Sequence, residues 1–348
     1  MPAVLVVNAG STSLKLHLVA ENESVESVEA LDAVRAADIA AVGHRVVHGG
    51  ELVEPTLIDD DVRAAVEQLT QIAPLHNAPA LAAIDDARTV LPRLPHVAVF
   101  DTAFHAGMPP VASTYAVPRT WREDWGIRRY GFHGLSVEWS TQRAAELLGA
   151  EDARRLVVCH LGGGSSITAV RDGRSVDTTM GFTPLEGVPM ATRSGSVDPG
   201  AMLYVQRAHD LSVDDVDRAL NSESGLAGLA DGRDVRALVR AATDDETARL
   251  ALDVYTYRIA VAVSGMGAAL GGLDALVFTA GVGEHVPEIR AAACERLDFL
   301  SVELDPELNE RSTPDADIAT SGSSVRILVI AAREELVAAR AVRTLLPA

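Results

Sequence analysis

Residues 4–18 read VLVVNAGSTSLKLHL: an apolar run, a turn of small residues, and leucines that alternate with Lys15 and His17. Such alternation is typical of a β-strand, so the segment predicts two strands joined as a hairpin. The same order returns in LVVCHLGGGSSITAV at residues 156–170. This repetition predicts two similarly folded halves facing each other across a cleft, each offering backbone N–H groups of its turn to a phosphate. Two unrelated hairpins are the alternative.

The composition favours an α/β protein of two domains. A chain of 348 residues exceeds the usual size of one hydrophobic core. Apolar residues make up 48% of the chain and aromatic residues only 4%, so we expect a core of Val, Ala, Leu and Ile, as in sheets covered by Ala-rich helices. The net charge of −19 argues against nucleic acid and an anionic membrane as partners, because both attract positive surfaces.

Cysteine content and hydropathy indicate a protein of the cytoplasm. Cys159 and Cys294 are the only cysteines, too few for a disulfide framework. No charged leader or cleavage site accompanies the first apolar run, and the apolar stretch 259–270 is interrupted by glycines and a serine. We therefore expect neither secretion nor membrane insertion.

Apolar periodicity predicts the other main elements. A helix is expected at 287–297, after a third glycine turn at 279–284, in an arrangement suited to contacting a nucleotide. The acidic stretch 305–317 is expected to be a surface loop. Further helices are expected at 62–72, 80–90, 135–148, 246–270 and 334–346, and further strands at 97–100 and 325–330.

Lys15 is the only lysine among 30 basic Lys and Arg residues, and it lies beside the first turn. A compact ammonium reaches a phosphoryl oxygen through a gap too narrow for the planar guanidinium of arginine. Ser11, Ser13 and Lys15 share one face if the strand begins early. The position indicates phosphate chemistry, with chance placement of a leftover lysine as the alternative. No Gly-x-x-x-x-Gly-Lys-Ser/Thr motif occurs, so the fold is not a P-loop.

Four further residues are candidates for anion chemistry. Arg45 and Arg193 lie among glycines or small residues, and each needs an anion, either an internal carboxylate or a ligand. Asp101 follows an apolar strand, where it can hold Mg²⁺ through water or cap the next turn. His133 lies between glycines, a position that suits a hydrogen-bond donor to a developing oxyanion; a structural histidine is the alternative.

In this order, the segments resemble the acetate kinases, which belong to the superfamily of acetate and sugar kinases, heat-shock proteins and actin. The resemblance implies two ribonuclease-H-like domains, the duplicated actin-like ATPase fold, flanking a central cleft. Residues 1–105 with 334–348 are expected to form the acyl and phosphate side, and 106–333 the nucleotide-binding and dimerisation domain. The matching motifs lie at 8–16, 43–51, 73–77, 99–105, 130–134, 160–166, 181–187, 193–199 and 278–284.

The resemblance also implies the activity and the role of each site residue. The activity is reversible, direct in-line phosphoryl transfer from ATP to acetate, giving acetyl phosphate and ADP, with Mg²⁺ or alternatively Mn²⁺, in a homodimer. Catalytic roles fall to Arg45, Asp101, His133 and Arg193; the acyl pocket to Arg45, Val47, Leu75, Phe132 and Pro184; the metal to Asn8 and Glu334, with Asp101 beside them. Nucleotide and phosphate binding falls to Ser11, Ser13, Lys15, His160, Gly162, Gly163, Gly164, Asp231, Gly232, Arg233, Gly281, Val282, Gly283 and Glu284.

The chain departs from the family pattern at several positions. The span from residue 19 to 43 is short, Gly163 and Arg333 replace asparagines, and His285 follows Glu284 where asparagine is usual. These departures leave open a donor other than ATP, such as pyrophosphate. The acceptor alternatives are propionate and butyrate, and the alternative from another class is a nucleotide-binding, actin-like protein without transfer activity.

Overall fold

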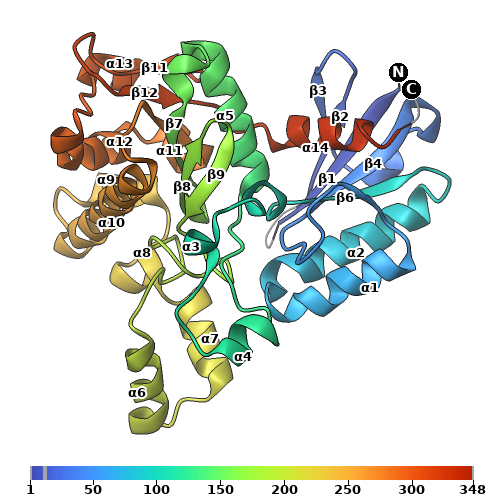
Figure 1. The fold of residues 1–348 in the computed structure, drawn as a ribbon, viewed down its shortest axis with the longest axis horizontal. Coiled ribbons are helices and arrows are strands. Elements are labelled where there is room, and N and C mark those ends of the chain that lie inside the picture. The colour runs from blue at the N-terminus through green and yellow to red at the C-terminus, as the bar shows by residue number, and fades with distance from the viewer. Residues whose placement is uncertain (1, 11–13, 347–348) are drawn as a thin grey trace. The chain divides into compact units, whose positions relative to one another are not determined.

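The computed structural model describes residues 2–10 and 14–346, and these divide into two compact units. The first unit takes its residues from 1–106, 130–139 and 333–348 (Figure 1). The second unit takes its residues from 107–129 and 140–332. Each unit contains one six-stranded mixed sheet.

The sheet of the first unit has the order β3-β2-β1-β4-β6-β5. β1 and β2 are antiparallel, with Val7 opposite Leu16 and Asn8 opposite Lys15, which confirms the predicted hairpin. β4 and β6 continue the sheet from β1 as parallel strands. The strands are β1 (Ala3–Ala9), β2 (Leu14–Val19), β3 (Val25–Val28), β4 (Ile39–Val46), β5 (Thr56–Leu57) and β6 (His96–Phe100).

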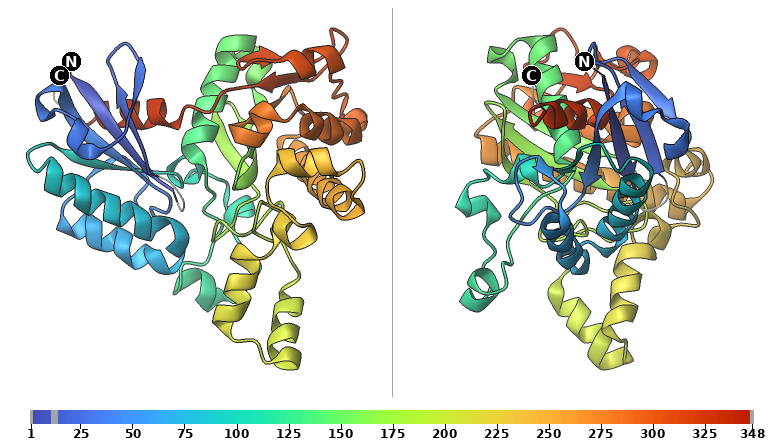
Figure 2. Two further views of the ribbon diagram at one scale, coloured as in Figure 1. Left: turned by 180° about the vertical axis from the view of Figure 1, so that it is seen from behind. Right: turned by 90° about the vertical axis from the view of Figure 1, so that its right-hand side faces the viewer.

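Helices cover both faces of this sheet. Successive side chains of a strand point to opposite faces, and consecutive residues of β1 are buried, so both faces need a cover. Val7 packs with Ala87 of α2. Gly43 lies opposite Val6, on the other face, and a Cβ at Gly43 would come within 2.7 Å of Val342 in α14. Helices α1 and α2 lie side by side (Figures 1 and 2). The helices are α1 (Asp60–Gln68), α2 (Pro74–Val90) and α14 (Glu334–Arg343), with 3₁₀ turns η1 (Leu31–Ala33), η2 (Ala36–Asp38), η3 (Leu69–Gln71) and η4 (Ala103–His105).

The sheet of the second unit repeats this topology. Its order is β11-β12-β10-β7-β8-β9, so three antiparallel strands are again followed by two parallel ones and a short antiparallel edge strand. This correspondence confirms the duplication that the two hairpin segments predicted. The strands are β7 (Arg155–Leu161), β8 (Ser165–Arg171), β9 (Arg174–Thr178), β10 (Ala275–Thr279), β11 (Ala316–Asp317) and β12 (Arg326–Val329).

The long helix α10 forms much of the core of the second unit against β8. It begins where Asp245 accepts hydrogen bonds from two backbone N–H groups and ends at Gly271 with a φ of 67°. α5 (Gly134–Leu148) starts in the first unit and ends in the second. The other helices are α3 (Pro110–Ser113), α4 (Arg119–Glu123), α6 (Pro199–His209), α7 (Val213–Ser222), α8 (Gly225–Leu229), α9 (Val235–Ala241), α10 (Glu246–Leu270), α11 (Ala280–His285), α12 (Pro287–Cys294) and α13 (Pro306–Arg311), with η5 (Glu151–Ala153) and η6 (Glu295–Leu300).

Two local expectations are wrong. The acidic stretch 305–317 is not a plain loop, because Asp305 caps α13 and Asp317 belongs to β11, where it pairs with Arg326. Most of the third glycine turn, expected at 279–284, is helix α11, which starts directly after β10. In the part of the chain that the structure describes, no helix is long and apolar enough to cross a membrane.

Two buried histidines of the first unit predict a loss of stability in acid. Burial lowers the pKa of His44 to about 3 and that of His105 to about 4. An unfolded histidine has a pKa of about 6.5, so below that pH the unfolded state binds more protons and unfolding becomes easier, by up to about 1.4 kcal/mol per pH unit for each histidine. We expect the free energy of unfolding in urea to fall by on the order of 2–4 kcal/mol between pH 7 and pH 5.

His44 offers the matched control for this prediction. Its Nε2 lies 3.0 Å from His96 Nδ1, and His96 Nε2 lies 3.1 Å from the Leu91 carbonyl. Since a carbonyl accepts only from a protonated nitrogen, His96 carries its proton on Nε2 and His44 donates. A His44→Gln variant keeps a donor at this place and loses part of the pH dependence. Equal unfolding free energies of the wild-type protein at pH 7 and pH 5 would contradict the prediction.

Candidate active site

Four polar residues of the first unit form one hydrogen-bonded group, which we call the Arg45 cluster: Asn8, Arg45, Asp101 and Glu334. Arg45 donates to both oxygens of Asp101, from Nε over 2.9 Å and from Nη2 over 2.5 Å. Its Nη1 donates to Asn8 Oδ1 over 3.1 Å, and its Nε lies 3.4 Å from Glu334 Oε2. Asn8 Nδ2 donates to the same Glu334 oxygen over 3.2 Å.

The topology explains why residues so distant in sequence meet. Asn8, Arg45 and Asp101 lie at or just after the carboxyl ends of the parallel strands β1, β4 and β6. Arg45 is two residues from Gly43 and therefore points to the same face, on which α14 packs. α14 begins at Glu334, so its first carboxylate reaches this edge of the sheet.

The cluster is a buried ion pair with one excess negative charge, because two carboxylates face one guanidinium. The side chains of Asp101 and Arg45 are 1% and 14% exposed. Burial disfavours the charge on Arg45, but Asp101 and Glu334 more than offset it and raise its pKa. Burial also raises the pKa of Asp101, with Glu334 adding to the rise and Arg45 opposing it. The anion that the sequence predicts beside Arg45 is either an internal carboxylate or a ligand, and the structure shows two internal carboxylates, Asp101 and Glu334.

Asp101 also holds the segment that carries Phe132 and His133. The His133 backbone N–H donates to the Asp101 carboxylate, and the Gly134 N–H donates to the Asp101 carbonyl over 3.0 Å. A Cβ at Gly134 would lie 2.0 Å from that carbonyl, so glycine permits this approach. His133 has a φ of 60°. His105 Nε2 lies 2.9 Å from the Phe132 carbonyl oxygen. The hydrogen bond from its backbone N–H to Asp101 therefore places His133 next to the Arg45 cluster.

Other predicted residues of the first unit lie on neighbouring elements. Val47 is buried just after β4, and Leu75 is 42% exposed in the first turn of α2. Asn77, for which no sequence pattern predicts a role, joins these two elements, because its amide accepts from the His48 N–H and donates to the His48 carbonyl, each over 3.1 Å. Lys15 is exposed on β2. Ser11 and Ser13 lie outside the described residues.

In the second unit, two predicted turns follow adjacent parallel strands. β7 and β10 pair so that His160 lies opposite Thr279. The turn Gly162–Gly164 follows β7 and closes with a 2.9 Å hydrogen bond from the Gly162 N–H to the Gly164 carbonyl. α11 follows β10, and a Cβ at Gly162 would lie 3.7 Å from Cβ of Ala280. The two turns therefore lie next to each other at the carboxyl edge of the sheet, the usual ligand edge of an α/β unit.

The glycines of these turns differ in their surroundings. A Cβ at Gly163 or Gly281 would meet no described atom within 4 Å, so a ligand can approach their backbone. At Gly283, by contrast, a Cβ would lie 3.3 Å from the carbonyl carbon of Phe278, so this glycine packs close to β10. Val282 belongs to the same short helix, and the Glu284 carboxylate accepts from the Ala332 N–H over 3.0 Å. Glu284 thus has a structural partner in Ala332. His285, which stands where the family usually has asparagine, places its Nε2 3.9 Å from Glu284 Oε2.

Arg193 and Pro184 are in contact. Arg193 Nη1 donates to the Pro184 carbonyl over 3.1 Å and lies 3.6 Å from Met190 Sδ. Burial lowers the pKa of Arg193, which means that its positive charge is poorly solvated. Because a poorly solvated cation interacts strongly with an anion, this side chain suits an anionic ligand. Asp231, Gly232 and Arg233 lie in the loop between α8 and α9, and Asp231 and Arg233 are exposed.

The described residues contain no group of three or more His, Cys, Asp or Glu side chains that would hold a metal ion by themselves. The Arg45 cluster contains two carboxylates and one amide. Their oxygens are of the type that Mg²⁺ prefers when water and substrate phosphates complete its shell. The residue types therefore fit Mg²⁺, with Asn8, Asp101 and Glu334 as the group to test.

The chain is similar to known proteins over most of its length. The model of the acetokinase family matches residues 23–340. An acetate kinase of Gloeobacter violaceus is 50% identical over 308 residues, 87% of this chain and 76% of that protein. An acetate kinase of Microcystis aeruginosa is 44% identical over 351 residues, 97% of this chain and 87% of that protein.

Solved structures give the same result for the fold. A propionate kinase of Francisella tularensis superimposes with a TM-score of 0.93 at 34% identity, over 99% of this chain and 100% of that one. An acetate kinase of Porphyromonas gingivalis has a TM-score of 0.88 at 33% identity, over 100% of both chains. The α/β fold with two equivalent sheets is the duplicated actin-like ATPase fold of these structures. The chain belongs to the acetokinase family.

Proposed function

We propose that the protein is an acetate kinase, a phosphotransferase that moves the γ-phosphoryl group of ATP to acetate and forms acetyl phosphate and ADP. The observation that carries this proposal is the family match over residues 23–340, together with about half-identical acetate kinases. The reaction is reversible, because the acyl phosphate formed is itself a phosphoryl donor.

The chemistry requires positioning and charge neutralisation more than proton transfer. Acetate is already an anion at neutral pH, so it attacks the phosphorus without a general base. One P–O bond to ADP breaks while one P–O bond to the acetate oxygen forms, and the negative charge spreads over the oxygens of the transferring group. Cationic side chains and hydrogen-bond donors stabilise that charge, which is what the candidate residues offer.

The roles we propose for the residues follow from their chemistry. Arg45 and Arg193 bind the acetate carboxylate and the transferring phosphoryl group, and His133 donates to a phosphoryl oxygen. Lys15, with Ser11 and Ser13, binds donor phosphate. Val47, Leu75, Phe132 and Pro184 contact the methyl end of the acyl group. Asp101 holds Arg45 in place through two hydrogen bonds, which support this role.

Asn8, Asp101 and Glu334 would hold Mg²⁺ or Mn²⁺. When bound, the ion neutralises charge on the phosphates of the nucleotide. The one excess negative charge of the Arg45 cluster supports this assignment. The orientation of Glu334 by the Asn8 amide and by Arg45 keeps its carboxylate at the edge of the sheet.

The nucleotide belongs, in this proposal, to the second unit. The backbone N–H groups of Gly162, Gly163 and Gly164 bind phosphate, and His160 and the N-terminal residues of α11 support them. Asp231, Gly232 and Arg233, with Gly281, Val282, Gly283 and Glu284, bind the adenosine. The open backbone at Gly163 and Gly281 supports these roles.

The acceptor, the oligomeric state and the location are further parts of the proposal. The structural relative named as a propionate kinase keeps propionate open as a second substrate, since one methylene is worth only about 1–3 kcal/mol of discrimination. We propose a homodimer, after the family, and a cytoplasmic location, where ATP is present. The free, buried thiols of Cys159 and Cys294 are consistent with a reducing compartment.

A hydroxamate assay for acyl phosphate tests these proposals together. The purified protein is incubated with Mg²⁺, with acetate, propionate or butyrate, and with ATP or pyrophosphate as donor. We expect the highest kcat/KM with ATP and acetate, a lower value with propionate and the lowest with butyrate. Acyl phosphate from pyrophosphate but not from ATP would contradict the donor assignment. No acyl phosphate in any combination would favour a nucleotide-binding protein without transfer activity.

A further inference from the structure

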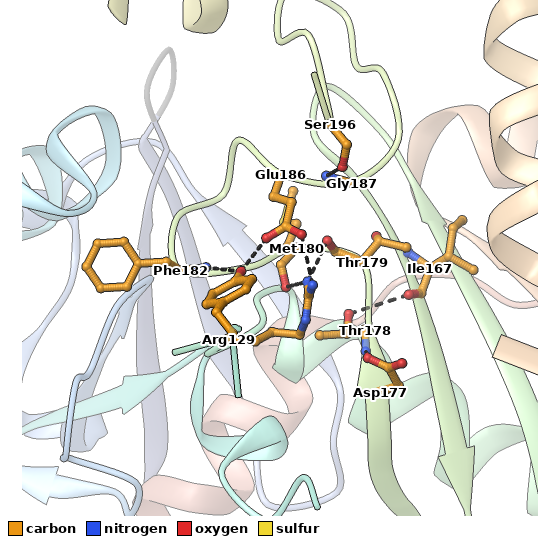
Figure 3. A network of polar contacts seen from close by, with 11 residues as sticks. Arg129, Ile167, Asp177, Thr178, Thr179, Met180, Phe182, Glu186, Gly187 and Ser196 are labelled. Carbon is orange, nitrogen blue, oxygen red and sulfur yellow. Dashed lines mark hydrogen bonds and ion pairs between the residues drawn. The ribbon is translucent and has the colours of Figure 1, made fainter. Parts of the chain in front are cut away.

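Tyr115, Arg129 and Glu186, which we call the Glu186 network, join the segment 181–187 to the rest of the second unit. Arg129 Nη2 donates to Glu186 Oε1 over 2.8 Å, and the Tyr115 hydroxyl donates to Glu186 Oε2. The Arg129 guanidinium also lies over the Tyr115 ring, 5.4 Å from its centre. Figure 3 shows the carboxylate of Glu186 and the end of Arg129 turned toward each other. No sequence pattern predicts a role for any of these three residues.

The network holds the start of the segment through its backbone. Arg129 Nη1 donates to the carbonyls of Thr179 over 2.9 Å and Met180 over 3.0 Å (Figure 3). The Phe182 N–H donates to the Tyr115 hydroxyl over 3.0 Å. A Cβ at Gly181 would lie 1.7 Å from Glu186 Oε2 and 2.0 Å from the Tyr115 hydroxyl, so the three groups close around this glycine.

The end of the segment is fixed as well. The Gly187 N–H donates to the Ser196 hydroxyl over 3.1 Å, and the Ser196 N–H donates to the Gly187 carbonyl over 2.8 Å (Figure 3). Between the two ends lies Pro184, whose carbonyl accepts from Arg193 over 3.1 Å. A shift of the segment therefore moves the Pro184 ring and the acceptor that orients Arg193 together.

We infer that Tyr115, Arg129 and Glu186 are positioning residues, which set the place of Pro184 and Arg193 and thereby the preference for short acyl groups. This inference rests on the proposed function, in which Pro184 contacts the acyl methyl and Arg193 binds an anionic group. The side chains of Arg129 and Glu186 are 16% and 34% exposed, so the pair is shielded enough to hold a fixed geometry. Removing one partner breaks hydrogen bonds that hold the backbone of the segment and lets the segment move.

The same unit contains a matched pair that does not touch this segment. Arg155 Nε donates to Asp274 Oδ1 over 2.9 Å, and Arg155 Nη1 donates to the Gly271 carbonyl over 3.3 Å. This pair also joins a guanidinium to a carboxylate and a carbonyl, but at the amino-terminal ends of β7 and β10, opposite the glycine turns. Asp274→Asn therefore controls for the loss of a comparable ion pair without effect on Pro184.

The test compares Glu186→Gln, Tyr115→Phe, the double variant and Asp274→Asn. For each, kcat/KM is measured with acetate and with butyrate at saturating ATP, and the folded state is checked by circular dichroism and melting temperature. We expect the acetate-to-butyrate ratio to fall at least about threefold in each single variant. The double variant should fall no further than the larger single effect, because both act on one segment. Asp274→Asn should leave the ratio unchanged.

The ratio separates positioning from stability, since a smaller folded fraction lowers both kcat/KM values equally. Folded Glu186→Gln and Tyr115→Phe proteins with the wild-type ratio would overturn the inference. If Glu186→Gln does not fold, the milder Tyr115→Phe variant decides alone. An Arg193→Ala enzyme with wild-type kcat would instead remove the proposed function of Arg193, which is a different failure from an unchanged ratio.

Discussion

Arg193→Ala is expected to lower kcat for acetyl phosphate formation by about 10³-fold or more, which is the contribution typical of an arginine that neutralises phosphoryl-transfer charge. The side chain is half-buried, and burial lowers its pKa, so its charge is poorly screened by water. An anionic group brought to this cation interacts with it more strongly than in water. The measurement is steady-state kcat and KM for acetate and ATP.

Two further variants make the Arg193 result interpretable. Arg193→Lys keeps the charge but loses the planar fork, and should recover only part of the activity. Arg218 is a surface arginine of the same unit with a side chain that is 59% exposed, so Arg218→Ala should behave as the wild-type protein. A folded Arg193→Ala enzyme with kcat within a few-fold of wild type would mean that this residue does not act on the transferring group.

Asp101→Ala is expected to destabilise the first unit by about 1–3 kcal/mol, the cost of leaving buried hydrogen-bond donors without their acceptor, and to abolish most of the activity. The substitution removes the carboxylate that accepts two hydrogen bonds from Arg45 and leaves that guanidinium buried beside a single remaining carboxylate. It also removes the acceptor of the His133 N–H. Urea unfolding and steady-state kinetics measure the two effects.

The same unit provides a control with matched geometry. Arg63 donates to both oxygens of Asp85 over 2.8 and 2.7 Å, so the fork is the same as in the Arg45–Asp101 pair. The Asp85 side chain is 46% exposed, however, and a partly solvated pair contributes only about 0–1 kcal/mol. Equal losses of unfolding free energy in Asp85→Ala and Asp101→Ala would contradict the importance of burial in the Arg45 cluster.

The sequence carries most of the fold, because its main signals are local. Apolar runs around small-residue turns predict the two hairpins, and apolar periodicity predicts a helix at 246–270, which has the bounds of α10. The expectation of a surface loop at 305–317 is wrong, because a run of acidic residues does not reveal that Asp305 caps a helix and that Asp317 pairs with Arg326.

The site is predictable only in part. Arg45 and Asp101 stand out as a charged residue in a strand and a carboxylate at a strand end, and the structure brings them together. That Glu334 joins them depends on the packing of α14 against Gly43, which no local pattern encodes. Glu186 lies within the motif 181–187 and Arg129 directly before the motif 130–134, but neither position indicates a partner, because their hydrogen bond joins residues 57 positions apart.

Phosphorus NMR of the wild-type protein with ATP, Mg²⁺ and acetate tests the central claim most directly. We expect acetyl phosphate and ADP to appear in equal amounts as ATP disappears, and the signals to revert when ADP and acetyl phosphate are supplied instead. Loss of ATP with inorganic phosphate as the only new phosphate species, or no loss of ATP at all, would contradict the assignment of this chain as an acetate kinase.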